Sequence, residues 1–130
     1  MNKLQEGHEY EKYVKNIIKP KYKNVWLWND VPNHIMTKLG YIKSDEILCD
    51  LICETNDSTF EYIQCKNYST TGNDNIINIS DLDDFYMFVA ENELSKVSYV
   101  YYSGKLSDEI VRKTKSIKYV NLPFDDCKHY

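Results

Sequence analysis

The amino-acid sequence predicts a single α/β domain over residues 1–130, in which a mixed central sheet is flanked by helices on both faces. One observation is the order of the predicted elements, α-β-(α)-β-β-α-β-α-β, which contains no internal repeat. Another is a β-hairpin at the centre of the chain. The third is the composition, because 42% hydrophobic and 28% charged residues are typical of a globular protein with a substantial core.

The first helix is predicted from about Glu6 to Ile18, ended by Pro20. Two apolar stripes fit this segment, and they place Glu11 differently. The first stripe buries the Glu11 carboxylate, which is costly without a partner, whereas the second leaves Glu11 at its flank. The first stripe consists of Leu4, Gly7, Glu11, Val14 and Ile18, and the second of Tyr10, Tyr13, Val14 and Ile17.

Short elements connect this helix to the centre of the chain. Residues 24–28 are rich in strand-forming side chains and predict a strand, and a turn follows at residues 30–32. Residues 33–40 predict a short helix that Gly40 closes.

The centre of the chain predicts a hairpin of two strands joined by a polar turn, residues 47–53, 60–68 and 56–58. If the hairpin is symmetric about Asp57, Asp50 lies opposite Gln64, at a Cβ separation of about 4.5–5.5 Å. Since side chains alternate along a strand, Gln64 and Lys66 point the same way. We therefore expect a carboxylate, an amide and an ammonium group on one face.

The second half of the chain predicts a loop, two helices and two strands. Ser80 is expected to cap a helix that continues to about Asn92, and Ser107 to cap the next helix. The loop covers residues 69–75 and the strands cover residues 96–102 and 117–122. The residues expected to face inward from the first of these helices are Leu82, Phe85, Tyr86 and Val89.

Charge is distributed unevenly along the chain. The net charge of −4 argues against a general nucleic-acid coat protein, yet residues 1–23 hold six lysines against three glutamates. Residues 81–93 hold five acidic side chains. Two interpretations stay open: two solvated helix faces of opposite sign, or an approach of phosphate groups from the N-terminal side.

Several classes of protein are not expected. No apolar run reaches the roughly 20 residues that span a bilayer, and the N-terminus lacks the apolar core of a secretory signal. The four cysteines form no CxxC pair, so we expect reduced cysteines in an intracellular protein without membrane contact.

Three segments resemble the PD-(D/E)xK nuclease superfamily, specifically its Mrr-like restriction-endonuclease branch. Residues 7–14 (GHEYEKYV) resemble the first-helix motif of that branch, with Glu11 at its acidic position. Residues 49–52 (CDLI) resemble the strand with the metal-binding aspartate, and residues 63–68 (IQCKNY) resemble the Q-x-K variant of the signature. Nuclease-like domains that precede helicase modules in large DNA viruses are similar at residues 25–32, 99–107 and 117–124.

The resemblance implies a restriction-endonuclease-like fold and a nuclease that hydrolyses DNA with Mg²⁺ or Mn²⁺. The metal ligands would be the carboxylates of Asp50 and Glu11, the side-chain oxygen of Gln64 and the backbone carbonyl of Cys65, which suit a hard divalent ion. Lys66 would orient the attacking water. The implied partners are DNA and a helicase module in the same or another chain, and whether the protein forms a homodimer to cut both strands stays open.

Two alternatives to a nuclease also stay open. One is a nuclease fold without activity that binds DNA for a neighbouring helicase, because residues 44–49 lack the glycine-rich G-D-x-G stretch of the branch and Gln64 replaces an acid. The other is a protein-interaction domain that uses a sheet edge.

Overall fold

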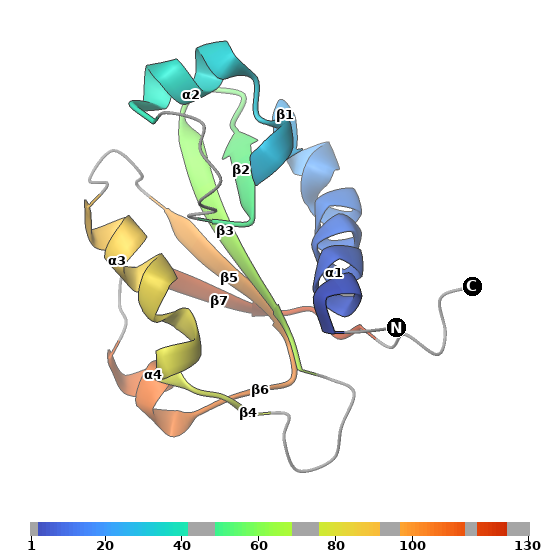
Figure 1. Cartoon of the computed structure of the whole chain (residues 1–130), viewed down its shortest axis with the longest axis vertical. Helices are drawn as coiled ribbons and strands as arrows, with labels where there is room; N and C mark the ends of the chain where they lie inside the picture. Colours follow the sequence, from blue (N-terminus) through green and yellow to red (C-terminus); the bar gives the residue numbers. More distant parts are fainter. Residues whose placement is uncertain (1–2, 42–48, 69–75, 92–96, 114–116, 125–130) are drawn as a thin grey trace.

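A five-stranded mixed sheet forms the centre of the molecule (Figure 1), in the order β1-β2-β3-β5-β7. The computed structural model describes residues 3–41, 49–68, 76–91, 97–113 and 117–124. Both the β1–β2 and β2–β3 pairs are antiparallel, whereas the β3–β5 and β5–β7 pairs are parallel. This arrangement confirms the predicted mixed sheet. The strands are β1 (Asn24–Leu27), β2 (Leu51–Glu54), β3 (Phe60–Asn67), β5 (Ser98–Ser103) and β7 (Ile117–Asn121).

Helices cover both faces of the sheet (Figure 1), as predicted. On one face α1 (Lys3–Ile18) packs against β1 and β3. The other face carries α2 (Asn33–Leu39), α3 (Asp83–Glu91) and α4 (Asp108–Lys113), whose buried side chains share one core. The described residues also include three 3-10 turns, η1 (Lys19–Lys21), η2 (Trp28–Asp30) and η4 (Ile79–Leu82). A small parallel sheet, which was not predicted, pairs β4 (Ile76–Ile77) with β6 (Lys105–Leu106).

The buried stripe of α1 matches neither predicted stripe completely. Tyr10, Val14 and Ile18 are fully buried, whereas Ile17 is 47% exposed. Glu11 lies at the edge of this stripe, with its side chain 20% exposed. The Glu11 carboxylate therefore lies at the edge of the contact between α1 and the sheet, and is not buried beneath the helix.

The hairpin of β2 and β3 has the predicted register. Leu51 pairs with Ile63 and Glu54 pairs with Phe60, so the turn is centred on Asp57 and the next position in this register is Asp50 with Gln64. The boundary of the first strand was wrong, because β2 begins at Leu51 and Asp50 lies in a bend just before it.

The helix starts of the second half differ in detail from the prediction. Asn78, and not Ser80, is the N-terminal cap, because Asn78 and Asp81 exchange side-chain to backbone bonds in a capping box. Ser107 directly precedes α4 as predicted, but its hydroxyl makes no hydrogen bond with a described residue. Phe88, which was not predicted to face inward, is buried, whereas Tyr86 and Val89 are only partly buried.

Some predictions lie outside the described residues. These are the N-terminal end of the first hairpin strand, most of the segment 44–49, the loop at residues 69–75, the end of the helix at Asn92, the start of the strand at Lys96, and Cys127. Within the described part of the chain, no helix combines the length and apolar character that crossing a membrane requires.

Candidate active site

Asp50 is held by three hydrogen bonds, two with β3 and one with η2. Its amide donates to the Ile63 carbonyl at 3.0 Å, and its own carbonyl accepts from the Trp28 amide at 3.0 Å. The carboxylate oxygen Oδ2 accepts from the Cys65 amide at 2.8 Å. This bond occupies the Cys65 amide, which would pair with the neighbouring strand if β2 extended through Asp50. The pairing of β2 with β3 therefore starts only at Leu51.

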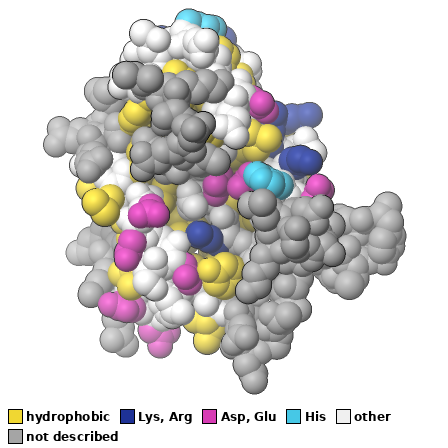
Figure 2. Space-filling view, in the orientation of Figure 1, with side chains coloured by type: hydrophobic (Ala, Val, Ile, Leu, Met, Phe, Trp, Pro, Cys, Tyr) yellow, Lys and Arg dark blue, Asp and Glu magenta, His cyan; other side chains and the backbone are white. Residues whose placement is uncertain are grey.

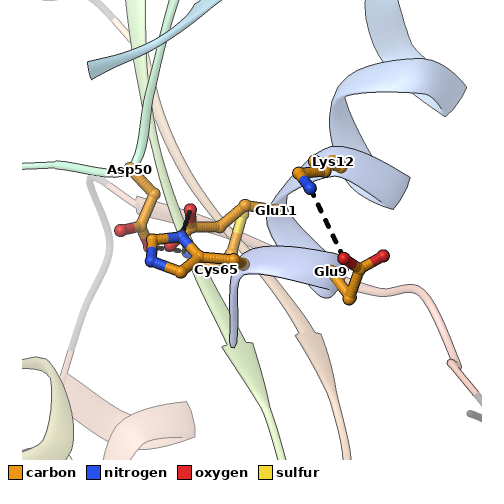
Figure 3. Close-up of polar contacts among 6 residues, drawn as sticks. Glu9, Glu11, Lys12, Asp50 and Cys65 are labelled. Carbon is orange, nitrogen blue, oxygen red and sulfur yellow. Dashed lines mark hydrogen bonds and ion pairs between the residues drawn. The ribbon is translucent and has the colours of Figure 1, made fainter. Parts of the chain in front are cut away.

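Glu11 of α1 meets Asp50 at this point. Figure 3 shows the two carboxyl groups directed toward one another, with Cys65 beside them. They are close enough for each to affect the pKa of the other: hydrogen bonding between them lowers the pKa of Glu11 and raises that of Asp50. Burial, followed by the charge of Glu11, raises the pKa of Asp50 to about 7, and burial also raises the pKa of Glu11. Two carboxyl groups buried side by side are therefore stabilised by nearby positive charge, either a proton or a bound cation.

Lys66 lies close enough to act on both carboxyl groups. Its positive charge lowers the pKa of Glu11 and of Asp50, against the larger effect of burial. Cys65 is buried in the core beneath α1, so side-chain alternation along β3 directs Gln64 and Lys66 toward the other face. The half-buried Gln64 side chain makes no hydrogen bond among the described residues.

The predicted residues are therefore brought together to different degrees. Asp50, Glu11 and the Cys65 backbone are in direct contact, and Lys66 interacts electrostatically with the two carboxyl groups. The paired register of β2 and β3 ends at Leu51 with Ile63, so the predicted pairing of Asp50 with Gln64 is not part of the ladder.

A pocket of about 210 Å³ opens beside the two carboxyl groups. The residues that sequence reasoning missed are on its wall: His8 contributes Nδ1 at 3.3 Å from Glu11 Oε2, and Asn29 and Asp30 come from η2. The i, i+3 spacing of His8 and Glu11 on a helix could have indicated the first of these. The complete wall consists of His8, Glu11, Leu27, Trp28, Asn29, Asp30 and Asp50.

The donor set is small. In the described segments, no group of three or more His, Cys, Asp or Glu side chains is arranged to hold a metal ion. Two carboxyl groups and the neutral oxygens of the hairpin are thus what the site offers a hard cation.

Comparison with known proteins defines the class. The family model Mrr_cat_2, described as "Restriction endonuclease", matches residues 14–122. The chain therefore belongs to this restriction endonuclease family. The match includes Asp50, Gln64 and Lys66, and Glu11 lies before it. Among curated proteins, none matches the chain.

The fold is also similar to part of a solved structure. An ATP-dependent Type ISP restriction-modification enzyme, LlaBIII, bound to DNA, superposes with a TM-score of 0.62 at 20% sequence identity. The alignment covers 93% of this chain and 8% of that enzyme, so the chain corresponds to a small part of the length of its neighbour. At this identity the likeness establishes a shared fold.

Proposed function

We propose that the protein is a metal-dependent nuclease that hydrolyses phosphodiester bonds in DNA. The observation that carries this proposal is the contact between Glu11 and Asp50, two carboxyl groups from different elements with Lys66 beside them. Membership of a restriction endonuclease family supports the same reaction.

The residues present fit Mg²⁺ or Mn²⁺. A pair of buried carboxyl groups with a raised pKa at Asp50 is stabilised by a bound cation. Mg²⁺ retains several of its waters, so a site with only two carboxylates is adequate for it. Asp50 and Glu11 would be the charged ligands, and the Gln64 side-chain oxygen and the Cys65 carbonyl the neutral ones. When bound, such an ion supplies an activated water and neutralises charge on the phosphate.

The protein side chains then have separate tasks. The Cys65 amide fixes the orientation of the Asp50 carboxylate through its 2.8 Å bond. Lys66 would orient the attacking water and stabilise negative charge as it develops on the phosphate. Gln64 removes one negative charge relative to a glutamate at that position, which favours one metal ion over two.

The wider setting is also part of the proposal. The structural neighbour is an ATP-dependent enzyme bound to DNA, which supports action together with a helicase or a similar ATP-driven module in the same or another chain. The free, buried cysteines Cys49, Cys53 and Cys65 support an intracellular location. A homodimer that cuts both strands stays a hypothesis.

A second candidate function is DNA binding without cleavage, for which Gln64 is the specific observation. Loss of the usual acid weakens metal binding, and such a protein would bind DNA equally well with and without metal. Gln64→Glu separates the two cases, because it should retain or increase metal-dependent cleavage in a nuclease and create none in a binding module.

The test of the proposed function is a plasmid-nicking assay with Mg²⁺ or Mn²⁺. Asp50→Ala and Lys66→Ala should each lower cleavage by at least about 100-fold, a loss of roughly 2.7 kcal/mol or more of transition-state stabilisation. Asp84→Ala and Lys118→Ala are the matched controls, since both side chains are exposed and lie outside the site. Circular dichroism checks the fold of each variant. Cleavage that survives in both site variants would reject the assignment.

A further inference from the structure

A line of lysines runs along α1 and into the adjoining turn η1, outside the pocket. Lys12, Lys15 and Lys19, here called the lysine stripe, follow His8 at spacings of four, three and four residues. These spacings place His8 and the stripe along one side of the helix, rising about 1.5 Å per residue. The stripe lies next to Glu11, on the side of it away from the buried Tyr10.

The lysine stripe carries positive charge that is scarcely neutralised. Lys12 pairs with Glu9 at 3.4 Å, an exposed contact that Figure 3 shows on the outer side of α1. Neither Lys15 nor Lys19 has an ion-pair partner among the described residues. No acidic residue occurs in the sequence from residue 12 to residue 29, and Lys21 and Lys23 add two more exposed cations there.

Many of the other acidic residues lie at the starts of two helices on the opposite face of the sheet. Asp81, Asp83 and Asp84 lie at the start of α3, and Asp108 and Glu109 open α4. In Figure 2 acidic side chains gather at the lower left, where α3 and α4 lie, whereas basic and acidic side chains occur together at the upper right, near α1. The lysine stripe therefore lies beside a pocket whose own wall is acidic, with Glu11, Asp30 and Asp50.

The stripe leads to the pocket. His8 lines the pocket and touches Glu11, and Lys15 lies one helical turn beyond Glu11 on nearly the same side. A polyanion bound along the stripe would therefore reach the two carboxyl groups, which repel phosphate unless cations accompany it.

We propose that the lysine stripe binds the phosphate backbone of the nucleic acid and guides it toward the pocket. The direction toward the pocket rests on the proposed function, whereas the binding surface itself does not. A repeated line of ammonium groups fits the repeated charge of a nucleic-acid backbone. A lipid surface fits less well, because α1 turns Tyr10, Val14 and Ile18 into the core and, among its side chains that the structure describes, exposes Ile17 as its large aliphatic residue.

The experiment measures binding of the whole chain to a fluorescently labelled 20-base-pair duplex by anisotropy, in EDTA, over a series of salt concentrations. The test variant is Lys15→Gln with Lys19→Gln. The matched control is Lys38→Gln with Lys118→Gln, which removes the same charge from exposed lysines of α2 and β7. Nicking by each protein is assayed separately with Mn²⁺.

We expect the test variant to bind roughly tenfold more weakly at low salt, and the slope of log affinity against log salt to fall by about 0.9 for each lost contact. The control should bind like the wild type. Equal losses in the two variants would show an effect of net charge only and would overturn the proposal, as would tighter binding of polyglutamate than of the duplex.

The outcomes also separate this proposal from the proposed function. Normal binding by the test variant together with intact nicking by the wild type would reject the stripe and leave the nuclease assignment standing. Stripe-dependent binding by a protein that never nicks DNA would confirm the stripe and reject hydrolysis.

Discussion

The two faces of the sheet differ in what they contribute to the protein. The face under α2, α3 and α4 holds the larger core, with clustered aromatic rings such as Phe85, Phe88 and Tyr62. The face under α1 has a smaller core, but its edge holds Glu11 and Asp50. The aromatic core lies under α2, α3 and α4, whereas the candidate site takes Glu11 from α1 and Lys66 from the opposite side of β3, so substitutions inside the aromatic core should affect stability more than activity.

The largest expected effect on stability is on the α3 face. Phe88 is 3% exposed and packs edge-on against Tyr62, with ring centroids 4.8 Å apart. Phe88→Ala should lower the free energy of unfolding by about 3–5 kcal/mol through lost burial and a cavity. Urea denaturation measures this loss, and nicking per folded molecule should stay unchanged. A loss of nicking larger than the loss of folded protein would show that the core under α3 also supports the active site.

A smaller loss of stability is expected under α1, together with a loss of activity. Val14 is fully buried one turn from Glu11. Val14→Ala should cost about 1–3 kcal/mol in the free energy of unfolding and loosen the helix that positions Glu11. The same two assays apply, and this variant should lose nicking beyond its loss of folded protein. Unaltered nicking would show that α1 does not need tight packing to hold the site.

The carboxyl pair predicts a pH dependence of stability in the absence of metal. Because the pKa of Asp50 rises from 3.8 to about 7 on folding, the folded state keeps a proton that the unfolded state loses in this window. The free energy of unfolding should therefore fall as the pH rises from about 4 to 7. Asp50→Asn should reduce that fall by about 1 kcal/mol or more. Urea denaturation in EDTA across this range checks the sign, and a fall of equal size in Asp50→Asn would contradict it.

The smallest expected effect is on the outer surface of α1. The pair of Lys12 with Glu9 is exposed, so Glu9→Gln should change the free energy of unfolding by less than about 0.5 kcal/mol. If the lysine stripe binds phosphate, the same variant should bind duplex DNA slightly more tightly, because it frees Lys12. Weaker binding by Glu9→Gln, measured by anisotropy, would count against the stripe.

Much of the architecture follows from local sequence signals. The hairpin register was predictable because alternation and the polar turn around Asp57 agree, and Gly40 ends α2 with a left-handed backbone (φ +86°). The start of β2 was not predictable, since Asp50 uses its carboxylate to occupy the Cys65 amide. The Asp50 side chain can compete with the strand backbone for the Cys65 amide only after folding has brought Asp50 next to β3.

The candidate site, too, was predictable from the sequence only in part. Glu11, Asp50 and Lys66 were found from motif spacing, and folding brings them within electrostatic reach. The contribution of Asn29 and Asp30 to the pocket depends on β1 lying beside β2, which places η2 next to Asp50. Sheet order is a tertiary property, so local patterns did not reveal these two residues.

The proposed function requires a divalent cation to bind at the Glu11 and Asp50 carboxylates. The Cys65 amide reports on this directly, because it donates to the Asp50 carboxylate. In a titration of the ¹⁵N-labelled protein with Mg²⁺ at pH 6, its NMR resonance should shift in the wild type and not in Asp50→Asn, with protons released as metal binds. A Cys65 resonance that does not shift with Mg²⁺, or that shifts equally in both proteins, would contradict metal binding at Glu11 and Asp50.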